Sequence, residues 1–238
     1  MTKLLLIFLA MFQYTPAGPV FQTSGGGGGG PTVVQSQPTN NSSTVTYSTP
    51  ITVGNILVLG FYAGANTDTL TATDTLGNTF VTLSPTPFGL GTDADGLAIV
   101  CAPITTGGSD TVQFKVNGSG TNAWSVAYEV HTTHGTCTTD VASAHSNTLA
   151  STSCNSGAMT TTTANDFLVS VCGLDGTNTS TITAGSGWSG GLNANLTGPT
   201  RPIVMSQYQV GTTPGSYTAT SGTIPSEEQA TVLVAIKP

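Results

Sequence analysis

Three residues at regular spacing, His131, His134 and Cys137, are of the types that bind zinc in proteins. His131 is the last of residues 122–131, which alternate apolar and polar side chains as a half-buried strand does. A further cysteine, Cys154, ends the long polar segment that comes next. In an oxidising compartment, cysteines at the two ends of such a segment favour a disulfide over a metal site, and the histidines are then ordinary loop residues. We therefore expect no bound metal and no cofactor.

The chain contains four cysteines, an even number that suits an exported, disulfide-bonded protein. We predict that Cys137 and Cys154 are bonded to each other and close the polar segment. Cys101 and Cys172 each lie in an apolar run, and a disulfide between them would join two strands. The alternative for this second pair is two buried free thiols.

The acidic residues and one serine motif give little support to catalysis. A glycosidase needs two carboxylates at a suitable separation, but Glu129 alone lies well inside a strongly patterned strand. Residues 187–191 match the G-x-S-x-G motif around Ser189, yet the flanking sequence supplies neither the strand before nor the helix after that the motif requires. We therefore expect a protein without enzymatic activity.

Aromatic side chains make a stronger case for sugar binding. Trp188 lies in a glycine-rich stretch, and Tyr208 and Tyr62 lie on predicted strands, so each could offer a flat apolar face to a saccharide. The alternative is that these rings pack in the core or beneath loops. A carbohydrate-binding module is therefore the alternative function that the sequence supports.

The composition favours an uncharged, hydroxyl-rich surface. Only 6% of the residues are charged, against about 25% in an average soluble domain. The net charge is −7 with four basic residues, so no basic stripe is available for phosphates, and we expect no nucleic-acid partner. Threonine suits a solvated strand face because its branched carbon favours the extended chain while its hydroxyl meets water. These features predict an all-β protein.

The N-terminal segment has the features of a signal peptide. Lys3 precedes an apolar run over residues 4–12, and the small residues Thr15 and Ala17 suit cleavage after Ala17. We assign residues 1–17 to this peptide; the alternative is an apolar segment retained for anchoring or assembly. No other segment has the length and hydropathy of a membrane span, so none is expected in the mature chain.

Residues 18–30 are predicted to be a tether, because the six consecutive glycines at 25–30 cannot hold one conformation by themselves. Residues 31–238 are predicted to form a single domain. Many short strands separated by turn residues predict an antiparallel two-sheet sandwich, jelly-roll-like, without helix. The predicted strands are residues 43–48, 56–63, 69–73, 78–83, 97–104, 110–116, 122–131, 158–163, 166–174, 180–184, 202–210, 216–221 and 229–237.

Four segments carry a resemblance to a known group of proteins. They are residues 52–60 (TVGNILVLG), 73–80 (TDTLGNTF), 127–130 (AYEV) and 160–169 (TTTTANDFLV). Together they resemble a group of exported bacterial and phage-encoded β-sandwich modules, over the chain from about Thr32 to the last strand. The resemblance implies the fold but no activity, since the motifs belong to strands and turns. The chain departs from the group at residues 131–134, where a Ser-Gly type of turn is expected.

We expect a non-catalytic extracellular structural or adhesive subunit, located at a cell surface or, alternatively, in a virion. The segment that begins Thr32, Val33, Val34 is a short β-prone piece behind a flexible tether, and it could add to the open sheet edge of a neighbouring copy. The alternative is that it pairs within its own domain as the first strand. The expected partners are thus further copies of the chain, in an oligomer or filament, or surface glycans.

Overall fold

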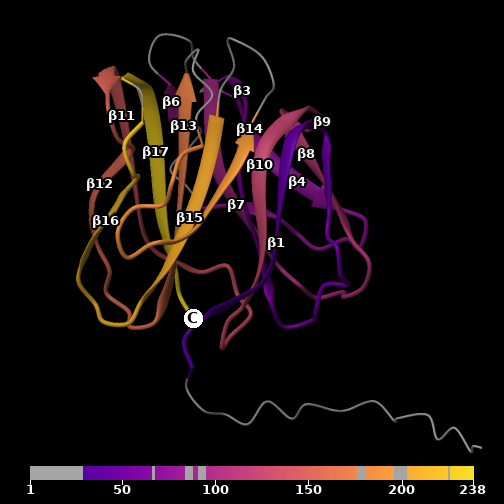
Figure 1. Cartoon of the computed structure of the whole chain (residues 1–238). Coiled ribbons are helices and arrows are strands. Elements are labelled where there is room, and N and C mark those ends of the chain that lie inside the picture. Colours follow the sequence, from indigo (N-terminus) through magenta and orange to yellow (C-terminus); the bar gives the residue numbers. More distant parts are fainter. Residues whose placement is uncertain are drawn as a thin grey trace, which may run out of the picture.

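The computed structural model describes residues 29–65, 68–83, 88–90, 95–175, 181–195, 203–224 and 226–238, so the predicted signal peptide lies outside the described residues. Every regular element in them is a β-strand (Figure 1). The predicted all-β class is thereby confirmed. The strands are β1 (Thr32–Ser42), β2 (Thr44–Thr46), β3 (Ile56–Ala65), β4 (Leu70–Asp74), β5 (Val81–Thr82), β6 (Phe88–Leu90), β7 (Asp95–Pro103), β8 (Thr111–Val116), β9 (Ser119–Gly120), β10 (Ala123–His131), β11 (Thr139–Ser151), β12 (Asn155–Thr160), β13 (Asp166–Asp175), β14 (Ser189–Asn195), β15 (Ile203–Gly211), β16 (Ser216–Thr220) and β17 (Glu227–Ile236).

These strands form four antiparallel sheets rather than the two that we expected. The first inner sheet has the order β1-β10-β3-β7-β5, with β6 beside β7, and the first outer sheet has the order β2-β8-β4, with β9 beside β8. The second inner sheet has the order β11-β17-β13-β15-β14, and the second outer sheet is β12-β16. The sandwich is therefore built from two pairs of sheets, and a jelly-roll connection of its strands stays a prediction.

Three apolar layers hold the four sheets together. On β3, Ile56 and Val58 pack against the second inner sheet in a central core, while Leu57 and Leu59 pack against the first outer sheet. On the other side of the molecule, Leu168 and its neighbours pack against the second outer sheet. Both inner sheets are thus covered on both faces, which explains the unbroken apolar runs that encode their central strands.

Strand β10 shows the consequence for the sequence-based prediction. Val126, Tyr128 and Val130 lie on the central face as predicted. Ser125 and Glu129 on the opposite face are buried as well, because the first outer sheet and its loops cover that side. The prediction of a half-buried strand was wrong, since alternation of apolar and polar residues indicates solvent on one face only when nothing else covers it.

The second half of the chain repeats the first. Strands β1, β10, β3 and β7 occupy the same places in the first inner sheet as β11, β17, β13 and β15 do in the second, and β2 and β8 correspond to β12 and β16. The register shifts at the start of β1, between Val33 and Gln35, and at the start of β11, between Thr139 and Val141, also correspond. We call residues 32–137 the first unit and residues 138–238 the second unit.

Local details support the same correspondence. The hydroxyl groups of Ser42 and Ser151 each accept a hydrogen bond from the backbone amide two residues later, at the end of β1 and of β11. Just before β3, Gly54 has a φ of 90°, and just before β13, Asn165 has a φ of 62°. Left-handed backbone favours glycine and, next, asparagine, so the two turns solve one steric problem in the two units.

The disulfides join Cys101 to Cys137 and Cys154 to Cys172. All four cysteines are bonded, so the predicted pairing of Cys137 with Cys154 was wrong. Cys101 and Cys172 are neither bonded to each other nor free thiols, the two alternatives considered for them. The polar segment is not a loop, because it contains the 13-residue strand β11. At about 3.3 Å per residue such a strand separates its ends by roughly 40 Å, whereas bonded cysteines have Cα atoms within about 7 Å. Each disulfide lies within one unit.

Peptide mapping under non-reducing conditions is expected to recover one peptide pair that contains Cys101 and Cys137 and another that contains Cys154 and Cys172. Replacing both Cys154 and Cys172 by alanine should lower the free energy of unfolding by about 3 kcal/mol, because the bond closes a loop of 18 residues in the unfolded chain. Recovery of a peptide that links Cys137 to Cys154 would contradict this fold of residues 139–151.

Candidate functional site

The start and the end of the described chain lie together at one end of the molecule, which we call the base (Figure 1). Thr32 pairs with His131 there, and the amide of Lys237 donates to the carbonyl of Thr138. The strands that run from the base end at the opposite end of the molecule, where Ala65 pairs with Asp95 and Leu174 with Ile203. The first described residues therefore lie at the base.

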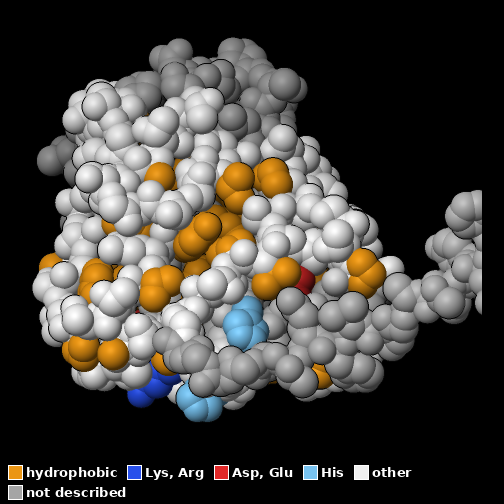
Figure 2. Space-filling view, turned by 60° about the horizontal axis from the view of Figure 1, so that its bottom comes forward, with side chains coloured by type: hydrophobic (Ala, Val, Ile, Leu, Met, Phe, Trp, Pro, Cys, Tyr) orange, Lys and Arg blue, Asp and Glu red, His pale blue; other side chains and the backbone are white. Residues whose placement is uncertain are grey.

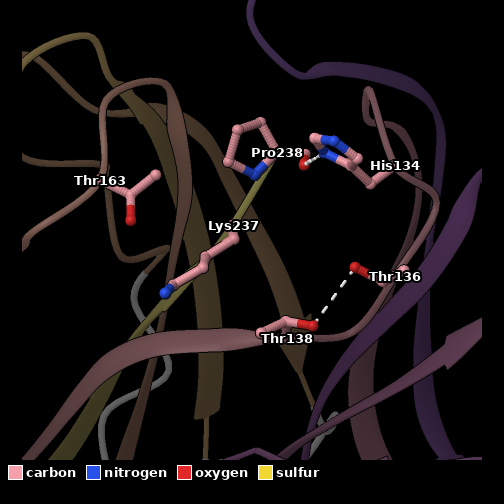
Figure 3. A pocket seen from close by; sticks show the side chains of 6 residues that line it. All are labelled: His134, Thr136, Thr138, Thr163, Lys237 and Pro238. Atoms are coloured by element: carbon pink, nitrogen blue, oxygen red, sulfur yellow. Dashed lines mark hydrogen bonds between the residues drawn. The ribbon is translucent and has the colours of Figure 1, made fainter.

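A cavity of about 280 Å³ opens at the base (Figure 3). The ring of His134 meets the carbonyl oxygen of Pro238 through Nδ1, and the hydroxyls of Thr136 and Thr138 lie 3.3 Å apart. The amino group of Lys237 points away from His134 and lies 3.6 Å from Oδ1 of Asp140. The residues that line the cavity are His134, Thr136, Thr138, Thr163, Lys237 and Pro238. The cavity thus has hydroxyls, one imidazole and one ammonium at its wall.

The three residues of the H-x-x-H-x-x-C pattern each contact a different partner. Nδ1 of His131 lies 3.0 Å from Oδ1 of Asn55, whereas His134 contacts Pro238 and Cys137 is in a disulfide. Across the part of the chain that the structure describes, no group of three or more His, Cys, Asp or Glu side chains is placed to hold a metal ion. The pattern therefore does not form a zinc site.

Asp140 connects β11 to the turn that precedes β13. Its carboxylate accepts hydrogen bonds from the amide and the hydroxyl of Thr162, both at 2.5 Å, and from the amide and the hydroxyl of Thr163, both at 3.3 Å. Burial alone would raise the pKa of Asp140, but these hydrogen bonds lower the pKa to about 2. An ionised Asp140 thus fixes the turn at the start of β13.

Asp166 is the first residue of β13, and its side chain is fully buried. No hydrogen-bond donor within the described residues faces either of its carboxyl oxygens. Burial first, and then the negative charge of Asp140, raise the pKa of Asp166 to about 7, and Lys237 only partly offsets this. Asp166 is therefore protonated at pH values below about 7.

In the first unit, Glu129 has the role that Asp140 has in the second. There Glu129 accepts hydrogen bonds from the amide of Thr52 at 2.9 Å, from Nδ2 of Asn55 at 2.6 Å and from Nε2 of Gln35 at 2.7 Å. Asn55 precedes β3 as Asp166 begins β13, so a protonated Asp166 stands where the first unit has an amide donor. Each unit thus uses the carboxyl group of one side chain, Glu129 or Asp140, as the acceptor that holds the turn before its central strand, and we call this arrangement the carboxylate staple.

Two carboxyl groups whose pKa values are pushed far apart are typical of acid–base catalysis. Here Asp166 has no exposed surface, so a substrate in the cavity would not reach it. Asp166 also corresponds to Asn55, an amide that cannot transfer protons at neutral pH. The arrangement is therefore explained as a structural staple.

The aromatic residues selected for sugar stacking do not form one surface. Tyr62 has an exposed fraction of only 3% and packs edge-to-face on Trp124, so the prediction that it stacks on a ligand was wrong. Tyr208 packs on Tyr128 and Phe167 at the central core, whereas Trp188 packs on the apolar layer beneath the second outer sheet. Tyr208 and Trp188 are partly exposed on opposite faces of the second inner sheet, and the role of each in binding stays a prediction.

The remaining candidates have structural surroundings. Ser189 is the first residue of strand β14, which lies where the G-x-S-x-G elbow would need a helix. Val33 packs against the central core, and Val34 has an exposed fraction of 52%. Thr32 and Val33 pair with β10 of the same chain, so the alternative of a first strand within its own domain is the one observed. Figure 2 shows few charged side chains on the face that includes the base.

Comparisons with protein-family models, with curated proteins and with solved structures find no match for this chain. The resemblance to exported β-sandwich modules therefore stays a prediction. Within the described residues, no helix has the length and hydropathy to cross a membrane.

Sequence reasoning missed Asp140, Asp166 and the repeat that gives them meaning. The signal was present, because residues 54–58 read Gly-Asn-Ile-Leu-Val and residues 165–169 read Asn-Asp-Phe-Leu-Val. Both segments belong to those that carry the resemblance to β-sandwich modules, and the repeat becomes visible when one is set against the other. Aligning them places Asp166 on Asn55 directly.

The Asp166→Asn variant is expected to remove part of the pH dependence of stability. Because the folded chain raises the pKa of Asp166 to about 7, it binds this proton more tightly than the unfolded chain does, and stability falls as the pH rises from about 4 to about 7. The loss is at most about 4 kcal/mol. An amide keeps the donor at every pH, so urea unfolding of Asp166→Asn should show a higher midpoint than the native chain at pH 8.

The matched control is Asn55→Asp, which places a second carboxyl group beside Glu129 and should introduce the same fall in the first unit. Asp140 acts in the opposite sense, because its stabilisation is lost only as the pH falls from about 4 through about 2. If the urea midpoint of Asp166→Asn changed between pH 5 and pH 8 by as much as that of the native chain, the proposed role of Asp166 in the staple would be refuted.

Proposed function

We propose that this chain is a non-catalytic structural or adhesive subunit of an extracellular surface, on a cell or in a virion, held there by its N-terminal tether. The observation that carries the proposal is the position of the tether junction. Gly30 lies beside Val210 and Asn165. The start of the described chain lies near its C-terminal end at the base (Figure 1). A domain held at its base presents the opposite end and both outer sheets to its surroundings.

The composition and the disulfides fit this role. Two disulfides indicate an oxidising environment. Only 6% of the residues are charged, so contacts between neighbouring domains in an array would be made mostly by uncharged side chains.

Self-association would use the base end of β1. This strand ends the order of the first inner sheet, and edge strands can pair with another chain. Pro38 interrupts the middle of β1 because it lacks an amide hydrogen, which leaves the part from Thr32 to Val34 for contacts with a neighbour. Val34 belongs to the bulge in this part, and its exposed side chain supplies an apolar contact. Contacts between copies are therefore proposed at Val34.

The alternative of a carbohydrate-binding module has weaker support. Trp188 and Tyr208 are each partly exposed, but they lie on opposite faces of one sheet, so one saccharide could not stack on both. Binding would have to depend on a single ring.

The test compares the mature chain with its Val34→Lys variant by analytical ultracentrifugation and electron microscopy. The native chain is expected to form oligomers or filaments at high concentration, and Val34→Lys should remain monomeric because a charge would be buried between copies. Val81→Lys is the matched control, since Val81 is another exposed valine, on β5 at the other edge of the first inner sheet. A native chain that stays monomeric and binds a glycan array, with loss of binding in Trp188→Ala, would reject the proposal in favour of the alternative.

A further inference from the structure

The contacts between the two inner sheets occur in corresponding pairs. Strand β10 of the first unit packs on β14 and β15 of the second, and β17, which corresponds to β10, packs on β6 and β7 of the first. Strand β6 lies beside β7 as β14 lies beside β15, so β6 and β14 correspond as well, and β1 contacts β14 as β11 contacts β6. Reciprocal contacts of this kind define an isologous interface, in which two copies of one surface meet around a two-fold axis.

The axis can be located from the strand registers. In the first unit Ile56 pairs with Val130, and in the second Phe167 pairs with Ile236, so Ile56 corresponds to Phe167. Four residues further on, Gly60 corresponds to Val171. These two corresponding residues face each other, because a Cβ atom added to Gly60 would lie 2.1 Å from Cγ2 of Val171. A residue that meets its own counterpart marks the position of a two-fold axis.

Each unit is otherwise complete. Among the described strands, no sheet combines strands of both units. The disulfide between Cys101 and Cys137 lies in the first unit, and that between Cys154 and Cys172 lies in the second. Each unit also has its own apolar layer between its inner and its outer sheet. The units therefore depend on each other mainly through the central core.

We propose that the central face of each inner sheet is a self-association surface whose partner is a second copy of the same β-sandwich unit, and that the chain is a covalently joined pair which retains the two-fold interface. The fusion explains the pair at the axis. In a dimer of identical units, glycine at both positions would leave a void and valine at both would clash. The two units of a joined chain can differ in sequence. With Gly60 opposite Val171, a single valine side chain fills the space at the axis.

The first test exchanges the two side chains at the axis in the full chain. Gly60→Val alone should lower the urea midpoint because its side chain overlaps Val171, and Val171→Gly alone should lower it because it leaves a void. The double variant Gly60→Val/Val171→Gly restores one valine to the pair, so its midpoint should lie above that of either single variant. A double variant at least as unstable as the sum of the two single effects would overturn the proposed axis.

The second test asks whether the surface holds the units without the covalent link. A protease site is inserted between Cys137 and Thr138 of the full chain, where no disulfide spans the cut. After cleavage under non-reducing conditions, the two fragments should elute together from a sizing column at the volume of the uncut chain and separate only in denaturant. Fragments that elute apart in native buffer would overturn the proposal.

Discussion

The packing of the two inner sheets on each other is the constraint on which the rest of the structure depends. Each inner sheet has one outer sheet of its own, with four strands in the first unit and two in the second, so the central strands of both inner sheets are covered on both faces. Their central strands therefore need apolar side chains in both directions, as Ile56 to Leu59 show. Only 6% of the residues are charged. The polar groups that face solvent are therefore mostly hydroxyls and amides, and they lie on the outer sheets, the sheet edges and the turns.

The carboxylate staples show how the two units satisfy one local demand with different chemistry. Both turns before the central strands expose backbone amides that need acceptors, and both receive a buried carboxylate. In the first unit the side-chain amides of Asn55 and Gln35 donate to Glu129, and amides keep their hydrogen atoms at every pH near neutrality. In the second unit Asp166 takes the place of the amide. A carboxyl group can donate a hydrogen bond only while it is protonated, so the stability of this turn depends on pH. The two units have diverged most clearly here and at the axis, where Gly60 faces Val171.

The sequence predicted the fold class and the central strands, since residues 56–63, 97–104 and 166–174 are apolar runs bounded by turn residues. It did not predict β11 or the whole of β1, because these strands carry Thr, Ser and Asn at the edges of their sheets, where alternation is weak. The missed strand β11 also explains the wrong disulfide pairing. Burial of Tyr62 and the meeting of Asp140 with Asp166 depend on how sheets stack, and a pattern along one strand carries no information on that. The repeat was readable, but only by comparing the two halves of the chain.

Hydrogen–deuterium exchange at increasing denaturant, read at single amides, tests most directly that the two units share one central core. The amides of β10 and β3 in the first unit and of β17 and β13 in the second are expected to be the slowest to exchange, and to lose protection together at one denaturant concentration, because each inner sheet covers the other. Loss of protection in one unit while the other stays protected would contradict this account, since the units would then be independent domains that merely touch.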